Sequence, residues 1–222
     1  MGEAVGSMLA SAAGIAISPL ALIAMVLVLA TPRGRANGLA LAAGWVGALA
    51  AVVAVVVAVG SGPGGGDGRP TWSSWLRFAL GVLLVLLAAR QWRDRPREGH
   101  VRAPPPWMRE MDRFTVARSA GLGAVLVAAG PKDLALAVGG AAGIATAPAG
   151  GAGKAVAGVL MVLVGSLCVL LPLGVHLLGG ASSARILGEW KAWLAAHHAA
   201  IDTTVLAVLG AAYLGDAVTG LG

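Results

Sequence analysis

The stretch VLVAAGPKDLALAVGG (Val125–Gly140) places proline, lysine and aspartate, at positions 131–133, inside a run of alanine, valine, leucine and glycine. The apolar run extends outward from it to about Val116–Ala147, which is 32 residues. A straight helix of that length would reach about 48 Å at about 1.5 Å per residue, whereas the hydrocarbon core of a bilayer is about 30 Å thick. The run must tilt, protrude or break. Proline lacks a backbone donor, so it favours a break at Pro131.

The composition places the whole chain in a membrane. Of its 222 residues, 58% are hydrophobic and 12% are charged, whereas soluble domains carry about 25% charge. A bilayer span needs about 20 apolar residues. We predict an all-α integral membrane protein whose six transmembrane helices cover about Val5–Ala30, Gly38–Gly60, Trp75–Ala89, Val116–Ala147, Val156–Leu178 and Thr203–Leu221. The first run is too long for a signal-peptide core and lacks a basic start, so we expect it to be retained.

Basic residues predict the orientation of the spans. The segment between the third and fourth spans is rich in arginine, and cytoplasmic loops carry an excess of Lys and Arg. This central loop is therefore expected in the cytoplasm, together with the turns holding Arg33 and Arg185, so both termini face outward. Apolar residues at helical spacing in Trp107–Phe114 and Ile186–Leu194 indicate either helices lying in the inner interface or extensions of the spans.

The two halves of the chain resemble each other. The first span contains Ser18-Pro19 and the fourth contains Gly130-Pro131, each followed by an apolar stretch, a proline-containing turn and a glycine-punctuated helix. Because three spans reverse the direction of the chain, the pattern predicts an inverted-topology repeat, a common transporter plan. The expected division is a first repeat over 1–95, a basic cytoplasmic loop over 96–115 and a second repeat over 116–222.

Two proline breaks would place half-helix ends around one central site. Loose backbone is tolerated at membrane depth only inside protein or beside a water-filled cavity, and half-helix N-termini attract anions. The predicted substrate or ion site consists of Ser18, Pro19, Pro131, Lys132 and Asp133. In it Lys132 attracts an anionic group and Asp133 carries a proton. The alternative is that the lysine and the aspartate only neutralise each other or extend toward the interface.

Other polar residues carry weaker signals. The single cysteine, Cys168, lies in an apolar run and is interpreted as a small buried residue. Asp202 is interpreted as a helix cap at the start of the last span, and the pair His197-His198 as a weak metal signal. Hard cations need several oxygen ligands, and the interiors of the spans offer essentially one carboxylate, Asp133, since Asp216 lies near the outer end of the last span. We expect no metal, no cofactor and no nucleic-acid partner.

The segments SPLALIAMVLVLATPRGRANGLALAAGWVGAL and GPKDLALAVGGAAGIA resemble the GAP or Sap-like family, the peptidoglycolipid- and sulfolipid-addressing proteins, in the lysine-exporter (LysE) superfamily. The resemblance covers nearly the whole chain. It implies a small secondary exporter in a bacterial cell membrane, or a helper that moves cell-envelope glycolipids to the surface. The residues that match are Ser18, Pro19, Pro131, Lys132 and Asp133.

Two classes of function stay open at this point. The first is a secondary transporter exporting a small or lipidic anion, driven by a proton or other ion gradient. The second is a non-transporting assembly factor for a larger glycolipid exporter. An enzyme is not expected, because the sequence contains no HExxH or GxSxG motif. Membrane lipids are expected partners, and glycine-rich runs such as Gly139–Gly143 would also suit packing in a homodimer.

Overall fold

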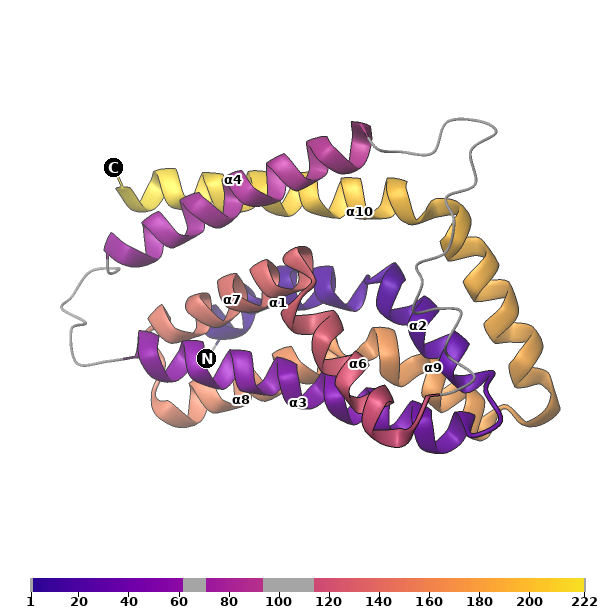
Figure 1. Cartoon of the computed structure of the whole chain (residues 1–222). Helices are drawn as coiled ribbons and strands as arrows, with labels where there is room; N and C mark the ends of the chain where they lie inside the picture. Colours follow the sequence, from indigo (N-terminus) through magenta and orange to yellow (C-terminus); the bar gives the residue numbers. More distant parts are fainter. Residues whose placement is uncertain (1, 62–70, 94–113, 222) are drawn as a thin grey trace.

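The computed structural model describes residues 2–61, 71–93 and 114–221, and these residues form helices joined by short turns, with no strand among them. The predicted all-α class is confirmed. Figure 1 shows the arrangement, and the elements are α1 (Gly2–Ala16), α2 (Pro19–Leu29), α3 (Gly34–Gly60), α4 (Thr71–Arg93), α6 (Val116–Ala128), α7 (Pro131–Thr146), α8 (Gly151–Gly165), α9 (Leu167–Leu178), the 3₁₀ turn η2 (Gly180–Ser182) and α10 (Ser183–Leu221).

Three helices, α3, α4 and α10, are each long and apolar enough to cross a membrane. Three further crossings form if each of the bent pairs α1–α2, α6–α7 and α8–α9 counts as one span. The structure is thus compatible with the six expected spans. The division into repeats and their inverted relation stay predictions.

The two expected proline breaks are present. Helices α1 and α2 meet at 43°, and α6 and α7 meet at 68°. Pro19 and Pro131 each occupy the first position of the second helix of their pair, where a missing N–H costs nothing. The residues before them, Ser18 (ψ 98°) and Gly130 (ψ 105°), are extended, because proline disfavours the helical conformation of the residue that precedes it.

Two features differ from the expected spans. The fifth span begins at Gly151 rather than near Val156 and bends by 58° at Ser166, between α8 and α9. The break follows Gly165-Ser166, and Gly/Ser pairs are a common cause of helix kinks. In the last part of the chain, Ile186–Leu194 and the sixth span form one 39-residue helix, α10, which curves in Figure 1. Of the other expected interfacial segment, Trp107–Phe114, all but Phe114 lies outside the described residues.

Glycines allow α3 and α6 to pack backbone to backbone. A Cβ atom on Gly44 would lie 1.9 Å from the carbonyl oxygen of Ala120, and one on Gly123 would lie 2.2 Å from that of Leu41. No side chain fits at either position. Small residues of this kind are what permits close helix approach in a membrane.

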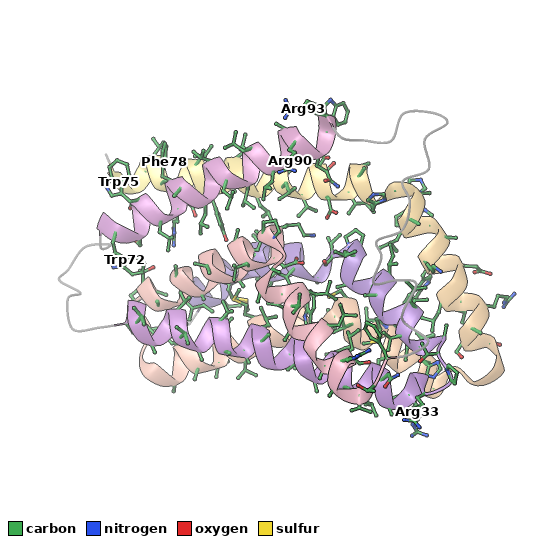
Figure 2. The ribbon with its side chains drawn as sticks, viewed as in Figure 1. Arg33, Trp72, Trp75, Phe78, Arg90 and Arg93 are labelled. Atoms are coloured by element: carbon green, nitrogen blue, oxygen red, sulfur yellow. The ribbon has the colours of Figure 1, made fainter. Side chains whose placement is uncertain are left out.

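Helices α4 and α10 form an antiparallel pair at the top of Figure 1, beside the bundle of the other helices. Arg77 of α4 bonds Asp216 of α10 at 3.3 Å. Further along, a Cβ on Gly81 would meet Leu214, and a Cβ on Gly210 would meet Val85. Trp75 and Phe78 are exposed on the outward face of α4, whereas Trp72 lies on the side of α4 that faces the end of α3 (Figure 2). This apolar outer surface suits contact with lipid.

Candidate functional site

The two proline breaks meet inside the bundle. The hydroxyl of Ser18, the N-cap residue of α2, donates a hydrogen bond of 3.0 Å to Oδ2 of Asp133 in the first turn of α7. Both residues are buried. The contact joins positions 115 residues apart in the sequence, so the breaks of the two halves are built into one polar cluster.

Lys132 connects three elements at this cluster. Its Nζ donates to the carbonyl oxygen of Ile17 at 2.9 Å and to Oδ1 of Asp202 in α10 at 2.9 Å. Oδ1 of Asp133 lies farther away, at 3.8 Å. The expected local neutralisation of Lys132 by Asp133 is therefore the weaker of its two ion pairs. The stronger pair ties α7 to α10.

Helix ends stabilise the charges of the cluster. Ile17 follows the last residue of α1, so Lys132 places its ammonium at the negative end of that helix. Asp133 lies in the first turn of α7 and accepts a hydrogen bond from Ser18, the N-cap residue of α2. Its carboxylate thus lies beside two positive helix ends. These interactions offset part of the large cost of removing charges from water.

Polar capacity in the cluster is not fully used. Within the described part of the chain, Oδ1 of Asp133 is buried without a hydrogen-bond partner, and the ammonium of Lys132 lies 3.8 Å from it. A buried acceptor of this kind is costly unless another group or water satisfies it. Asp133 can therefore accept one more hydrogen bond.

A cavity of about 590 Å³ opens beside the cluster. Ile17 and Ser18 belong to its wall as well as to the cluster, and α10 supplies Trp193, Ile201 and Thr204. Most of the wall is apolar, with a few hydroxyl groups near the charges. Such a cavity suits a ligand with an aliphatic part and a polar end.

The structure thus brings together all five residues of the predicted site, Ser18, Pro19, Pro131, Lys132 and Asp133. Their role in binding stays a prediction. The interpretation of Asp202 as a helix cap is wrong, because the residue lies well inside α10, where its carboxylate pairs with Lys132. The position of Asp202 beside an apolar span could have indicated a functional carboxylate. The sequence does not reveal its partner, because Lys132 lies 70 positions away.

Other polar candidates lie apart from the cluster's ion pairs. Asp216 pairs with Arg77, and the rings of His197 and His198 each bond a carbonyl of their own helix turn. Among the described residues, no group of three or more His, Cys, Asp or Glu side chains could hold a metal ion. Cys168 is buried, as expected.

Broken apolar helices around a buried charged cluster define a multi-pass membrane protein. A family model described as "Sap, sulfolipid-1-addressing protein" matches residues 8–219, nearly the whole chain. The chain belongs to this family, which confirms the Sap-like part of the resemblance. Neither the search of curated proteins nor that of solved structures found a match.

Proposed function

We propose that the protein is a secondary exporter in a bacterial cell membrane, moving a lipidic or small anionic substrate of the cell envelope. The observation that carries the proposal is the Ser18–Lys132–Asp133–Asp202 cluster, which joins both broken helices beside an apolar cavity. Membership of the lysine-exporter superfamily, an inverted repeat, a cytoplasmic central loop and outward termini are parts of this proposal.

Lys132 is the proposed contact for the anionic group of the substrate. Its ammonium is held by Asp202 and by the carbonyl of Ile17. A substrate anion entering the cavity beside Ile17 would compete with Asp202 for this lysine. Exchange of one anion for the other would loosen α10 from α7, which is the kind of differential contact that shifts a two-state equilibrium.

Asp133 is the proposed proton carrier. Its Oδ2 accepts from Ser18, and its buried Oδ1 accepts no hydrogen bond from the described residues. Protonation would remove a charge from the cluster and weaken the hold of Asp133 on Lys132. Intramembrane carboxylates in such settings commonly serve proton relays. Export would then follow the proton gradient.

The test is flux in proteoliposomes loaded with an amino-acid mixture or a fluorescent anionic lipid, with and without a pH gradient. Lys132→Ala is expected to lower flux at least about tenfold, because it leaves two carboxylates without their cation. Asp133→Asn is expected to abolish gradient-driven flux while leaving substrate exchange at equal pH. Glu189→Gln, an exposed carboxylate on α10, is the matched control and should behave as wild type.

Equal flux in wild type, Lys132→Ala and Asp133→Asn would contradict the proposal. The same holds if wild type moves neither substrate class under any gradient while remaining folded. The cluster would then be structural, and the role of a non-transporting assembly factor for a larger glycolipid exporter would take its place. Co-purification of that exporter with the wild-type chain would support the second role.

A further inference from the structure

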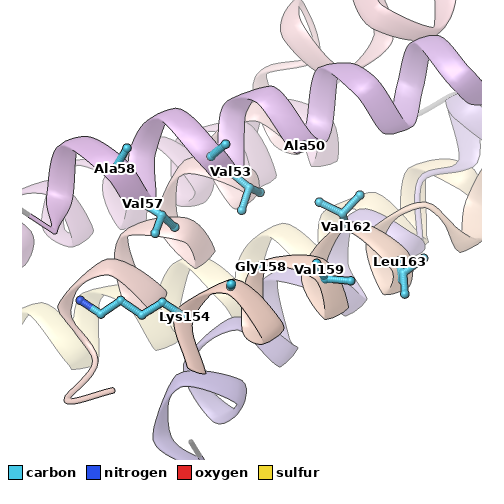
Figure 3. A pocket seen from close by; sticks show the side chains of 11 residues that line it. Ala50, Val53, Val57, Ala58, Lys154, Gly158, Val159, Val162 and Leu163 are labelled. Atoms are coloured by element: carbon cyan, nitrogen blue, oxygen red, sulfur yellow. The ribbon is translucent and has the colours of Figure 1, made fainter. Parts of the chain in front are cut away.

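A second cavity, which shares no lining residue with the first, lies between α3 and α8. Its volume is about 420 Å³. Small residues hollow it out from both helices, chiefly Ala50, Ala54 and Ala58 of α3 and Ala155 and Gly158 of α8. Figure 3 shows the groove between the two helices, with Lys154 at one end and Ala50 and Leu163 toward the other.

The groove has the dimensions of a lipid chain. Ala50 to Ala58 covers about 12 Å at about 1.5 Å per residue, and one leaflet of the hydrocarbon core is about 15 Å deep, half of about 30 Å. Valines and alanines make up most of the wall. Val159 and Leu163 on the rim are more than half exposed, so the groove opens sideways to where lipid surrounds the protein.

Lys154 supplies the one charge among the eleven lining residues. Its Nζ bonds the hydroxyl of Ser61 at 3.2 Å and the carbonyl oxygen of Ala145. An ammonium has three donors, so with these two acceptors among the described residues one N–H is left for a further acceptor. Lys154 also lies in the first turn of α8, whose N-cap residue, Gly150, has no side chain to accept from the free backbone N–H groups.

The level of Lys154 matches the headgroup region of a bilayer. Its partner Ser61 follows Gly60, and a Cβ on Gly60 would lie 3.2 Å from the ring of Trp72. Tryptophans such as Trp72 and Trp75 collect at the membrane–water interface. The apolar part of the groove therefore lies at acyl-chain depth, while its charged end lies at the level of lipid phosphates.

We propose that the α3–α8 groove binds one acyl chain of an anionic phospholipid, with the phosphate at Lys154 and the N-terminus of α8. Charge complementarity selects the headgroup, and the small residues make room for the chain. The site is separate from the Lys132 cluster and does not depend on transport.

The test is native mass spectrometry of the delipidated, purified protein titrated with phosphatidylglycerol or phosphatidylcholine. Wild type is expected to bind one phosphatidylglycerol with preference. Lys154→Met should lower that preference about fivefold, since a lysine near the surface contributes about 1 kcal/mol toward an anionic lipid, while Lys154→Arg keeps it. Lys191→Met, a change of another lysine outside the groove, is the control.

Two variants fill the groove from opposite walls. Gly158→Leu and Ala54→Leu are expected to remove the bound lipid of either headgroup. A Cβ on Gly158 would meet only Val53, at 3.5 Å, so the variant fits without strain at that atom. Gly121→Leu, where a Cβ meets nothing within 4 Å, is the matched control on α6. Cys168 is buried in the folded protein, so it reacts with a thiol dye only on unfolding. The temperature at which it becomes reactive therefore reports whether each variant is folded.

Three results would overturn the proposal. Unchanged lipid binding in a folded filling variant would show that the groove is not the site. An unchanged preference of Lys154→Met for phosphatidylglycerol would show that Lys154 does not contact the headgroup. Conversion of a wild-type dimer to a monomer by Gly158→Leu, with no lipid bound to either, would show that a second copy of the chain occupies the groove.

Discussion

Lys132 links α7 to the end of α1 and to α10. These partners explain why a lysine is tolerated in an apolar run. Its ammonium contacts a helix-end carbonyl and the carboxylate of Asp202, both at 2.9 Å. Removing one partner of a buried charge pair is costly, because the remaining charge stays desolvated. Changes to the cluster should therefore lower the stability of the fold as well as transport.

Asp202→Asn keeps an oxygen that can accept from Lys132 but removes the negative charge that compensates its ammonium. The change is predicted to lower the free energy of unfolding by about 1–3 kcal/mol, the range for leaving a buried polar group without full compensation. The measurement is the temperature at which Cys168, the only cysteine of the chain, becomes reactive to a thiol dye in detergent. Glu189→Gln, exposed on the same helix, should change it little. Equal stability of the two variants would mean that the ion pair between Lys132 and Asp202 does not stabilise the fold.

At the scale of elements, proline and small residues determine where helices bend and how closely they pack. Proline could be recognised in the sequence at both Pro19 and Pro131, and both breaks are found there. The bend after Gly165-Ser166 was not predicted, because glycine and serine occur throughout this chain and most of them do not kink a helix. Their effect depends on what packs against them.

Gly121 and Gly123 allow a direct test of that dependence. Gly123→Ala is predicted to destabilise the protein by about 1–3 kcal/mol, because the new Cβ would overlap the carbonyl of Leu41. Gly121→Ala, two residues earlier on α6, points into open space. It is predicted to stabilise the protein by about 0.4–1 kcal/mol, since alanine has less freedom to lose on folding.

Thermal unfolding followed at Cys168 measures both glycine variants against wild type. The decisive result is the sign: opposite shifts support the close α3–α6 contact. Destabilisation by both changes to the same extent would show that α6 is sensitive to any side chain and that the packing at Gly123 is not special.

For the whole molecule, the path of the chain separates its two ends from its basic turns. In Figure 1 the N- and C-termini both lie toward the left. In Figure 2 Trp72 lies on that side, Arg33 lies toward the right, and Arg90 and Arg93 lie at the end of α4 away from Trp72. Six crossings would place both ends of the chain on the same side of a membrane. The orientation that the basic residues predict stays a prediction.

The orientation is tested with single cysteines introduced into a Cys168→Ser background. Thr219→Cys, near the end of α10, is expected to react with a membrane-impermeant maleimide in intact cells. Ala36→Cys, at the start of α3, is expected to react only after the cells are opened. Both positions are exposed. Labelling of both from the same side would contradict six crossings, and the reverse pattern would invert the topology.

The sequence by itself determined the membrane class, the approximate spans and the two proline breaks, because these depend on local composition and on the fixed geometry of proline. It also pointed to Ser18, Lys132 and Asp133, since charged and hydroxyl groups stand out in an apolar run. Only the tertiary structure decided that Ser18 meets Asp133 and that Asp202 is the nearer partner of Lys132. Those pairings, like the α3–α8 groove, arise from the packing of helices distant in the sequence, and hydrophobic periodicity does not record which helices become neighbours.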